Sequence, residues 1–160
     1  MNIPLKEFPV PAGQRRSEEN DGMIWGLIPL SIKVSGEQTG GQVLVFEHRD
    51  MDKGGPPRHV HLDQDEWFYV VKGEFAFEVD GKTQRLRAGG SLFAPRNVPH
   101  AWANVGNEPG TLLTLLTPVG AFERFILDTT RYPTLPPPNA VENTLAAHGM
   151  KLLGPPLAVA

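Results

Sequence analysis

Apolar and polar residues alternate along most of the chain between residues 24 and 117, and this period of two predicts short β-strands. The first alternating run covers residues 24–34, where Pro29 favours an edge or bent strand because proline cannot donate a hydrogen bond to a sheet. The dipeptide Asp80-Gly81 predicts a tight hairpin, since both central residues of a type I′ turn need positive φ. Further runs of similar length and spacing cover residues 43–48, 66–71, 75–79, 82–86, 92–94, 100–104 and 111–117. Strands this short at such even spacing predict an all-β fold, either an antiparallel sandwich or a barrel.

Two stretches after the last strand predict short helices. Apolar residues repeat at helical spacing on one face of residues 121–128. In residues 139–148, Asn139 and Glu142 have the spacing of a capping box, and Gly149 is a natural helix stop.

The length of 160 residues suits a single domain. The first residues are rich in proline, glycine and charged side chains, which is typical of an arm rather than of a folded element. We therefore expect an N-terminal arm at residues 1–22, a barrel at residues 23–118 and a helical extension at residues 119–160.

Composition and charge exclude several classes of function. With 15 Lys and Arg against 18 Asp and Glu, the net charge is −3 and no basic run stands out, so we expect no nucleic-acid or anionic-membrane partner. The absence of cysteine excludes disulfides, iron–sulfur clusters, thiolate metal sites and a cysteine nucleophile. Neither a signal peptide nor a long apolar run is present, so we expect a cytoplasmic protein with no membrane span.

Three of the five histidines lie in two compact clusters that suit a metal site. His59 and His61 are two residues apart in an extended segment, so their side chains point the same way. Glu66 opens the next strand after a turn at residues 62–65, and its carboxylate can point back to the imidazoles. His100 begins another strand and can add a third imidazole. Ordinary hydrogen-bonded histidines are the alternative, but three nitrogens and one oxygen together favour a divalent transition metal with open coordination positions.

Two motifs that contain these residues resemble the conserved motifs of the cupin family. They are His59-x-His61-x4-Glu66-x6-Gly73 and Gly89-x5-Pro95-x4-His100-x3-Asn104. The chain departs from the family pattern at two glycine positions, where Lys53 and Asn97 stand. Neither position is a ligand, and asparagine tolerates left-handed backbone nearly as well as glycine. The set of ligand residues is therefore complete.

The resemblance implies a cupin jelly-roll β-barrel (double-stranded β-helix), followed here by the short C-terminal helices. It also implies one divalent transition metal (Fe, Mn, Ni, Co, Cu or Zn), held by His59, His61, Glu66 and His100. Within the family, the chain is similar to small single-domain, quercetinase-like cupins. In such proteins the matching glutamate also accepts a proton from the substrate hydroxyl, so the resemblance implies a catalytic role for Glu66.

Other residues near the motifs have simpler interpretations. If Glu66 points into the barrel, alternation turns Trp67 and Tyr69 outward. His48 is expected to be a packed or edge histidine rather than a fifth ligand, and Asn104 is expected to bind backbone groups. The residues expected to line a substrate pocket are Phe68, Phe77 and Trp102, although core packing explains Phe77 equally well.

Three classes of function suit these features: a metal-dependent dioxygenase acting on an aromatic or enol-type small molecule, a non-redox metal-dependent isomerase, cyclase or decarboxylase, and a non-catalytic cupin that binds a metal and a small molecule. The predicted inward positions offer no Lys or Arg, which counts against phosphosugars, and no part of the chain has room for a helix-turn-helix domain. Of the three classes we favour the dioxygenase. The outward aromatics and the run from Ile24 predict a homodimer.

Overall fold

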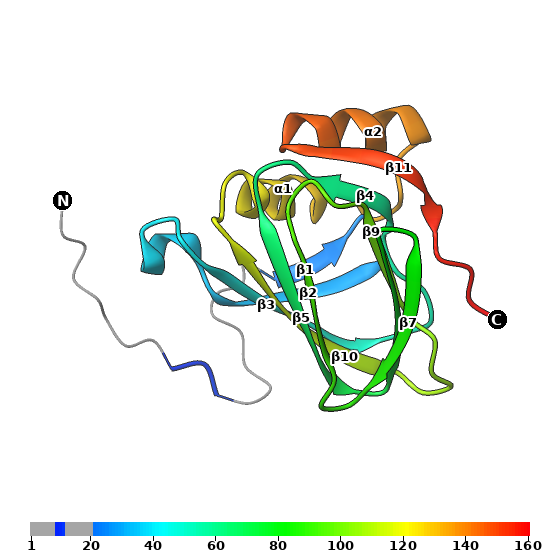
Figure 1. The fold of residues 1–160 in the computed structure, drawn as a ribbon. Helices are drawn as coiled ribbons and strands as arrows, with labels where there is room; N and C mark the ends of the chain where they lie inside the picture. Colours follow the sequence, from blue (N-terminus) through cyan, green and yellow to red (C-terminus); the bar gives the residue numbers. More distant parts are fainter. Residues whose placement is uncertain (1–8, 12–20) are drawn as a thin grey trace.

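Two antiparallel β-sheets and two short helices make up the fold in the computed structural model, which describes residues 9–11 and 21–160 (Figure 1). One sheet contains β1 (Asp21–Ile24), β2 (Ile28–Val34), β3 (Leu44–Met51), β5 (Asp65–Lys72), β8 (Ser91–Ala94) and β10 (Gly110–Thr117). The other contains β4 (Pro57–His61), β6 (Glu74–Val79), β7 (Lys82–Arg87), β9 (His100–Asn104) and β11 (Met150–Pro156). The strand orders are β1-β2-β3-β10-β5-β8 and β11-β4-β9-β6-β7. The predicted all-β jelly-roll class is confirmed.

Most strands follow the predicted alternation closely. In β5, Glu66 and Phe68 are buried, whereas Trp67 and Tyr69 are half-buried on the outer face of the sheet. The turn between β6 and β7 has positive φ at both Asp80 and Gly81, as the type I′ prediction requires.

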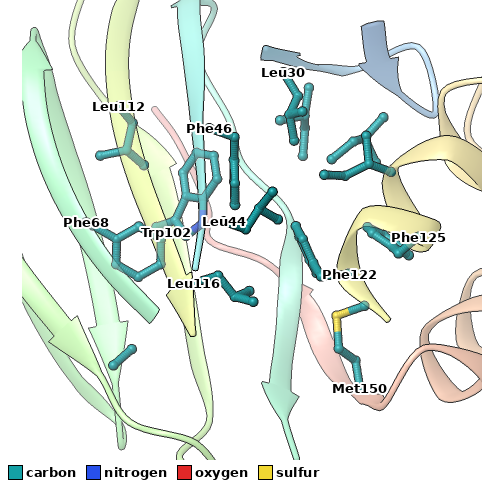
Figure 2. Close-up of a cluster of buried hydrophobic side chains, with 14 of the residues drawn as sticks. Leu30, Leu44, Phe46, Phe68, Trp102, Leu112, Leu116, Phe122, Phe125 and Met150 are labelled. Carbon is teal, nitrogen blue, oxygen red and sulfur yellow. The ribbon is translucent and has the colours of Figure 1, made fainter. Parts of the chain in front are cut away.

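The hydrophobic core fills the space between the sheets and continues beyond it to the helices. Figure 2 shows Phe68 and Leu112 on the barrel side of the cluster, and Phe125 of α1 (Phe122–Thr129) and Met150 of β11 on the other side. Each of these side chains is at most 5% exposed. Burying a side chain of this size stabilises the fold by about 1.5–3 kcal/mol, so we expect apolar burial to hold the barrel whether or not a metal is bound.

The run at residues 24–34, predicted as one edge or bent strand, is a hairpin. β1 and β2 pair antiparallel around a turn in which Trp25 and Gly26 both have positive φ (48° and 68°). The prediction was wrong here because a tryptophan in left-handed backbone gives no turn signal and because Ile24 and Ile28, on either side of the turn, keep the period of two. Trp25 is buried against Phe125, with ring centroids 5.6 Å apart, and this contact offsets the unfavourable backbone.

Both helices form close to the predicted positions. α2 (Pro138–Ala147) begins one residue earlier than expected, with Pro137 as N-cap and without the capping box of Asn139 and Glu142. That part of the prediction was wrong because Pro138 has the φ of a first helical residue and needs no partner for a backbone N–H.

The C-terminal region contains a strand in addition to its helices. β11 pairs with β4 and so extends the five-stranded sheet next to the strand that carries His59 and His61. Sequence alternation did not predict β11 because Gly154, Pro155 and Pro156 are poor strand formers, but an edge strand tolerates them.

The N-terminal arm predicted for residues 1–22 lies outside the described residues except for residues 9–11 and 21–22. Asp21 and Gly22 belong to β1. None of the helices in the described part of the chain is long and apolar enough to cross a membrane.

Candidate metal centre

The four predicted ligands converge on one buried point. His59 and His61 come from β4, Glu66 from β5 and His100 from β9, and one ligand atom of each lies within 4.8 Å of the others. The side chains are between 1% and 8% exposed. His59 is the cross-strand partner of His100, so the register of β4 and β9 places the two imidazoles together. The structure thus brings together all four residues that the motifs predicted.

The backbone and one glutamine fix the orientation of the three imidazoles. Each ring places its Nδ1 atom near an oxygen acceptor: Pro57 O at 2.8 Å from His59, Gln64 Oε1 at 3.2 Å from His61, and Val98 O at 3.2 Å from His100. An oxygen acceptor requires Nδ1 to carry the proton, which leaves Nε2 of each ring facing the shared point. Histidines that ligate metals through one ring nitrogen typically donate a hydrogen bond from the other, as these three do.

Glu66 is the anionic member of the cluster. Its Oε2 atom lies 3.0 Å from Nε2 of His100 and 3.3 Å from Nε2 of His61. Burial raises the pKa of Glu66, but the charges and hydrogen bonds of His61 and His100 outweigh burial and hold that pKa well below its ordinary value. The carboxylate is therefore ionised at neutral pH.

The pKa values of His59 and His100 are shifted in opposite directions. Burial, together with the neighbouring His100 and His61, lowers the pKa of His59 to about 3. Burial also acts to lower the pKa of His100, but the hydrogen bond and charge of Glu66 outweigh it, and the net pKa of His100 is raised. In this cluster Glu66 is therefore an ionised carboxylate, the imidazole of His100 favours a proton, and the imidazole of His59 is neutral.

The donor set fits a divalent transition metal. Nε2 of His61 is buried, and its 3.3 Å contact with Oε2 of Glu66 does not have the geometry of a hydrogen bond, which is costly unless a ligand occupies the shared point. Three imidazole nitrogens and one carboxylate oxygen match the preferences of iron, manganese, cobalt, nickel, copper and zinc, and leave coordination positions for a substrate. The geometry therefore supports a resident divalent metal at this point.

The second motif supports the cluster through its turn and its asparagine. Asn97 stands where the family has glycine, and its φ of 62° is the left-handed conformation that the substitution had to preserve. The N–H of Asn97 donates to the carbonyl of His61 at 2.8 Å. Asn104 is fully buried, donates to the carbonyls of Met51 and Glu108 and accepts from Gly106, so its predicted structural role is confirmed.

A cavity of about 380 Å³ borders the cluster, with His59, His61 and Glu66 in its wall. This volume lies in the range of cavities that bind small molecules. Leu27 and Leu135 border the cavity and are more than half exposed, so they mark its mouth.

The walls of the cavity differ from those expected. Trp102 borders it, as expected, but Phe68 and Phe77 do not; they lie in the core between the sheets, with ring centroids 5.4 Å apart. The inward direction of Phe68 and Phe77 was predicted correctly, but that part of the interior is filled by side chains. The cavity lies instead toward the β1–β2 hairpin, the two helices and β11. Wall residues that sequence reasoning missed include Trp25, Phe122, Val141, Leu145 and Leu152.

His48 is a further wall residue that sequence reasoning did not place in a site. It is 3% exposed, borders the cavity and packs between the rings of Phe46 and Trp102. It does not belong to the ligand cluster, in agreement with the prediction that it is packed. Its position on the buried face of β3, two residues from Phe46, was the available signal.

Comparison with known proteins identifies the family. A family model described as a cupin domain matches residues 48–116. Among solved structures, the chain is similar to an RmlC-like cupin from Shewanella frigidimarina, with 30% identity, 61% of this chain and 82% of that chain covered, and a TM-score of 0.51. It is also similar to KdgF from Halomonas sp., with 27% identity, 57% of this chain and 78% of that chain covered, and a TM-score of 0.50. The chain belongs to the cupin family.

Two curated relatives come from Streptomyces. The chain is 36% identical over 61 residues to polyketide synthase CurC of Streptomyces cyaneus. This match covers 38% of this chain and 40% of that protein. It is 33% identical over 61 residues to protein SchB of Streptomyces halstedii, and this match covers 38% of this chain and 44% of that protein. The matches thus span less than half the length of these curated relatives.

Proposed function

We propose that this cupin is a metal-dependent enzyme that acts on a small, largely apolar molecule with phenol or enol oxygens, and that its reaction is a dioxygenation. The observation that carries the proposal is the buried cluster of three histidines and one glutamate, of which His59, His61 and Glu66 lie in the wall of a largely apolar cavity. A purely structural metal site would need no adjoining cavity, and an apolar ligand-binding site would need no ionised carboxylate.

The bound metal, held by His59, His61, Glu66 and His100, would supply the one-electron chemistry that lets an organic substrate react with dioxygen. Both oxygen atoms of dioxygen enter the product, so the substrate itself provides the electrons and no further reductant is needed. The apolar walls exclude water, which protects reactive species from hydrolysis and strengthens electrostatic interactions inside the cavity.

Glu66 is the residue that moves a proton in this proposal. The carboxylate is ionised and borders the cavity, so it is placed to accept the proton of a substrate hydroxyl, which would leave an electron-rich phenolate or enolate. Nε2 of His100 lies 3.0 Å from Oε2 of Glu66, so the two groups are placed to bind the same ion beside the substrate.

The walls of the cavity favour an uncharged ligand. Among the described residues that line it, none is a lysine or an arginine, so a phosphate or carboxylate group would find no cationic partner apart from the metal cluster. The relative from Streptomyces cyaneus is named a polyketide synthase. Polyketide chains carry carbonyl groups that enolise and cyclise to phenols, and such compounds combine apolar rings with oxygens that ligate metals.

Metal reconstitution with measurement of oxygen consumption tests the proposal. Untagged protein is first assayed for metals by mass spectrometry; metal-free protein is then loaded with each of the six candidate ions and offered polyphenols and 1,3-diketones. Oxygen consumption with a redox-active ion, ¹⁸O₂ incorporation of both atoms and loss of both signals in Glu66→Gln are expected. Conversion of a substrate in the zinc-loaded protein without oxygen uptake would replace the dioxygenase with non-redox chemistry. Binding without conversion by any loaded form would leave a binding protein.

A further inference from the structure

We infer that His48 positions the substrate in the cavity by accepting a hydrogen bond from a hydroxyl or N–H group of the ligand. The inference rests on the proposed function in one respect, since it takes the cavity beside the metal cluster to be the ligand site. It concerns binding rather than conversion, and so it can be tested without any turnover.

The hydrogen bond of His48 to the neighbouring strand fixes its tautomer. Nδ1 lies 2.7 Å from the carbonyl oxygen of Pro29 in β2. A carbonyl oxygen only accepts, so Nδ1 carries the proton and Nε2 has the lone pair. Burial lowers the pKa of His48 to about 4, despite the carbonyl of Pro29 and the charges of Glu66 and Glu47. The ring is therefore neutral near pH 7, and Nε2 is an acceptor.

The acceptor atom has no partner in the described part of the protein. No described side chain or backbone group donates to Nε2, although the ring is 3% exposed and held between Phe46 and Trp102. Outside the metal cluster, His48 is the only ionisable side chain among the described residues that line the cavity. A ligand that fills the cavity would bury this acceptor, and burial without a donor is costly, so a site of this kind selects ligands that bring a donor.

The two polar features of the cavity wall, the metal cluster and His48, then define the ligand. One oxygen of the ligand would face the metal cluster, a second group with a hydrogen to donate would face His48, and the remainder would contact the apolar walls. A methyl ether at the second position would fill similar space but would leave Nε2 of His48 without a donor. The predicted specificity is therefore for a hydroxyl group over its ether.

Zinc-loaded protein with naphthalenediols as probes tests this specificity, because zinc does not support oxidation of the probe. The 1,3-, 1,6- and 2,7-dihydroxynaphthalenes are each compared with their monomethyl ethers, and dissociation constants are measured by calorimetry and by quenching of Trp25 and Trp102 fluorescence. In the wild-type protein, at least one diol should bind about three- to tenfold more tightly than its ether, as expected for one hydrogen bond.

Two variants separate hydrogen bonding from shape. His48→Phe keeps a ring but has no acceptor, so the preference for the diol should disappear; His48→Gln keeps an acceptor oxygen, so the preference should return. The ¹⁵N resonance of His48 Nε2 in the wild-type protein should also shift when the preferred diol binds, a readout that requires no variant. Equal affinity for every diol and its ether, absence of binding, or a preference that survives in a folded His48→Phe protein would overturn the inference. Failure to detect oxygenation would leave these results unchanged.

Discussion

Oε2 of Glu66 lies 3.0 Å from Nε2 of His100 and so joins β5 to β9 at the metal-ligand cluster. In the absence of a metal this contact requires a proton between the two atoms, because both the carboxylate oxygen and an unprotonated Nε2 are acceptors. A divalent cation can take the place of that proton, and binding of the metal is then coupled to release of the proton.

Glu66→Gln should weaken metal binding and abolish turnover for different reasons. The amide has nearly the shape of the carboxylate and still offers an oxygen, but it lacks the negative charge and cannot accept a proton at neutral pH. We expect the variant to bind metal at least about tenfold more weakly than the wild-type protein while retaining some metal. We also expect no conversion of substrate, even when metal is supplied in excess. Calorimetric titration with metal and an assay at saturating metal separate the two effects. Normal turnover at full occupancy would show that Glu66 is a ligand only.

His100→Ala should yield a folded protein with much less bound metal. Three ligands remain, and the barrel is held by apolar burial rather than by the metal, so circular dichroism should be unchanged. His48→Ala is the matched control: it also removes a buried imidazole, but one outside the cluster, and metal content should be unchanged. Mass spectrometry of the metal content reports both variants. Full metal occupancy in His100→Ala would remove the basis of the site.

The ligand cluster could be predicted from the sequence because its geometry is local. Two residues of separation in a strand place His59 and His61 on one face, and a short turn returns the chain to Glu66. His100 is distant in sequence, and its place became predictable through the spacing of the second motif rather than through periodicity.

The cavity could not be predicted in the same way. Its walls join the β1–β2 hairpin to α2 and β11, which lie more than a hundred residues further along the chain, and nothing in strand alternation specifies how such segments pack. Alternation shows that Phe68 points inward but not whether the space beside it is filled. The acceptor role of His48 likewise depends on a carbonyl of β2 that only the tertiary structure places.

Thr114→Val should leave stability unchanged or raise it by about 1 kcal/mol. The Oγ1 atom of Thr114 is buried without a hydrogen-bond partner among the described residues, and valine has the same shape without the polar atom. Thr129→Val is the matched control, because Oγ1 of Thr129 is equally buried but donates to the carbonyl of Phe125 at 2.7 Å. The control should be destabilised by about 1 kcal/mol or more, as seen in urea unfolding. A clear loss of stability in Thr114→Val would indicate that its hydroxyl has a partner, such as a buried water.

The outer face of the six-stranded sheet should form a homodimer interface. Cross-strand pairing places Phe93, Trp67, Leu115 and Val45 in one apolar row over β8, β5, β10 and β3, and Phe93 is 57% exposed. The row contains no charged residue, so a second copy can pack against it by two-fold symmetry without burying a charge.

Phe93→Glu should therefore convert a dimer into a monomer in light scattering at micromolar concentration, with an unchanged circular dichroism spectrum. The charge would be placed within the proposed interface, at the β8 end of the apolar row, where its burial against a second copy is costly. Leu153→Glu introduces the same charge at an exposed apolar residue of β11 in the other sheet and should leave the dimer intact. A wild-type monomer, or dissociation caused by both variants alike, would contradict the assignment of this face.

Acid should destabilise the metal-free protein partly through His48. Its pKa is lowered from 6.5 to about 4 in the folded state by burial, so between these values the unfolded chain binds more protons than the folded one. Stability from this group is therefore fully present above its unfolded pKa and is lost as the pH falls toward 4, by on the order of 2–3 kcal/mol. His48→Gln cannot titrate, so its free energy of unfolding in urea should fall less than that of the wild-type protein between about pH 7 and about pH 4. Parallel curves for the two proteins would mean that His48 is protonated to the same extent in the folded and unfolded states, which its burial does not allow.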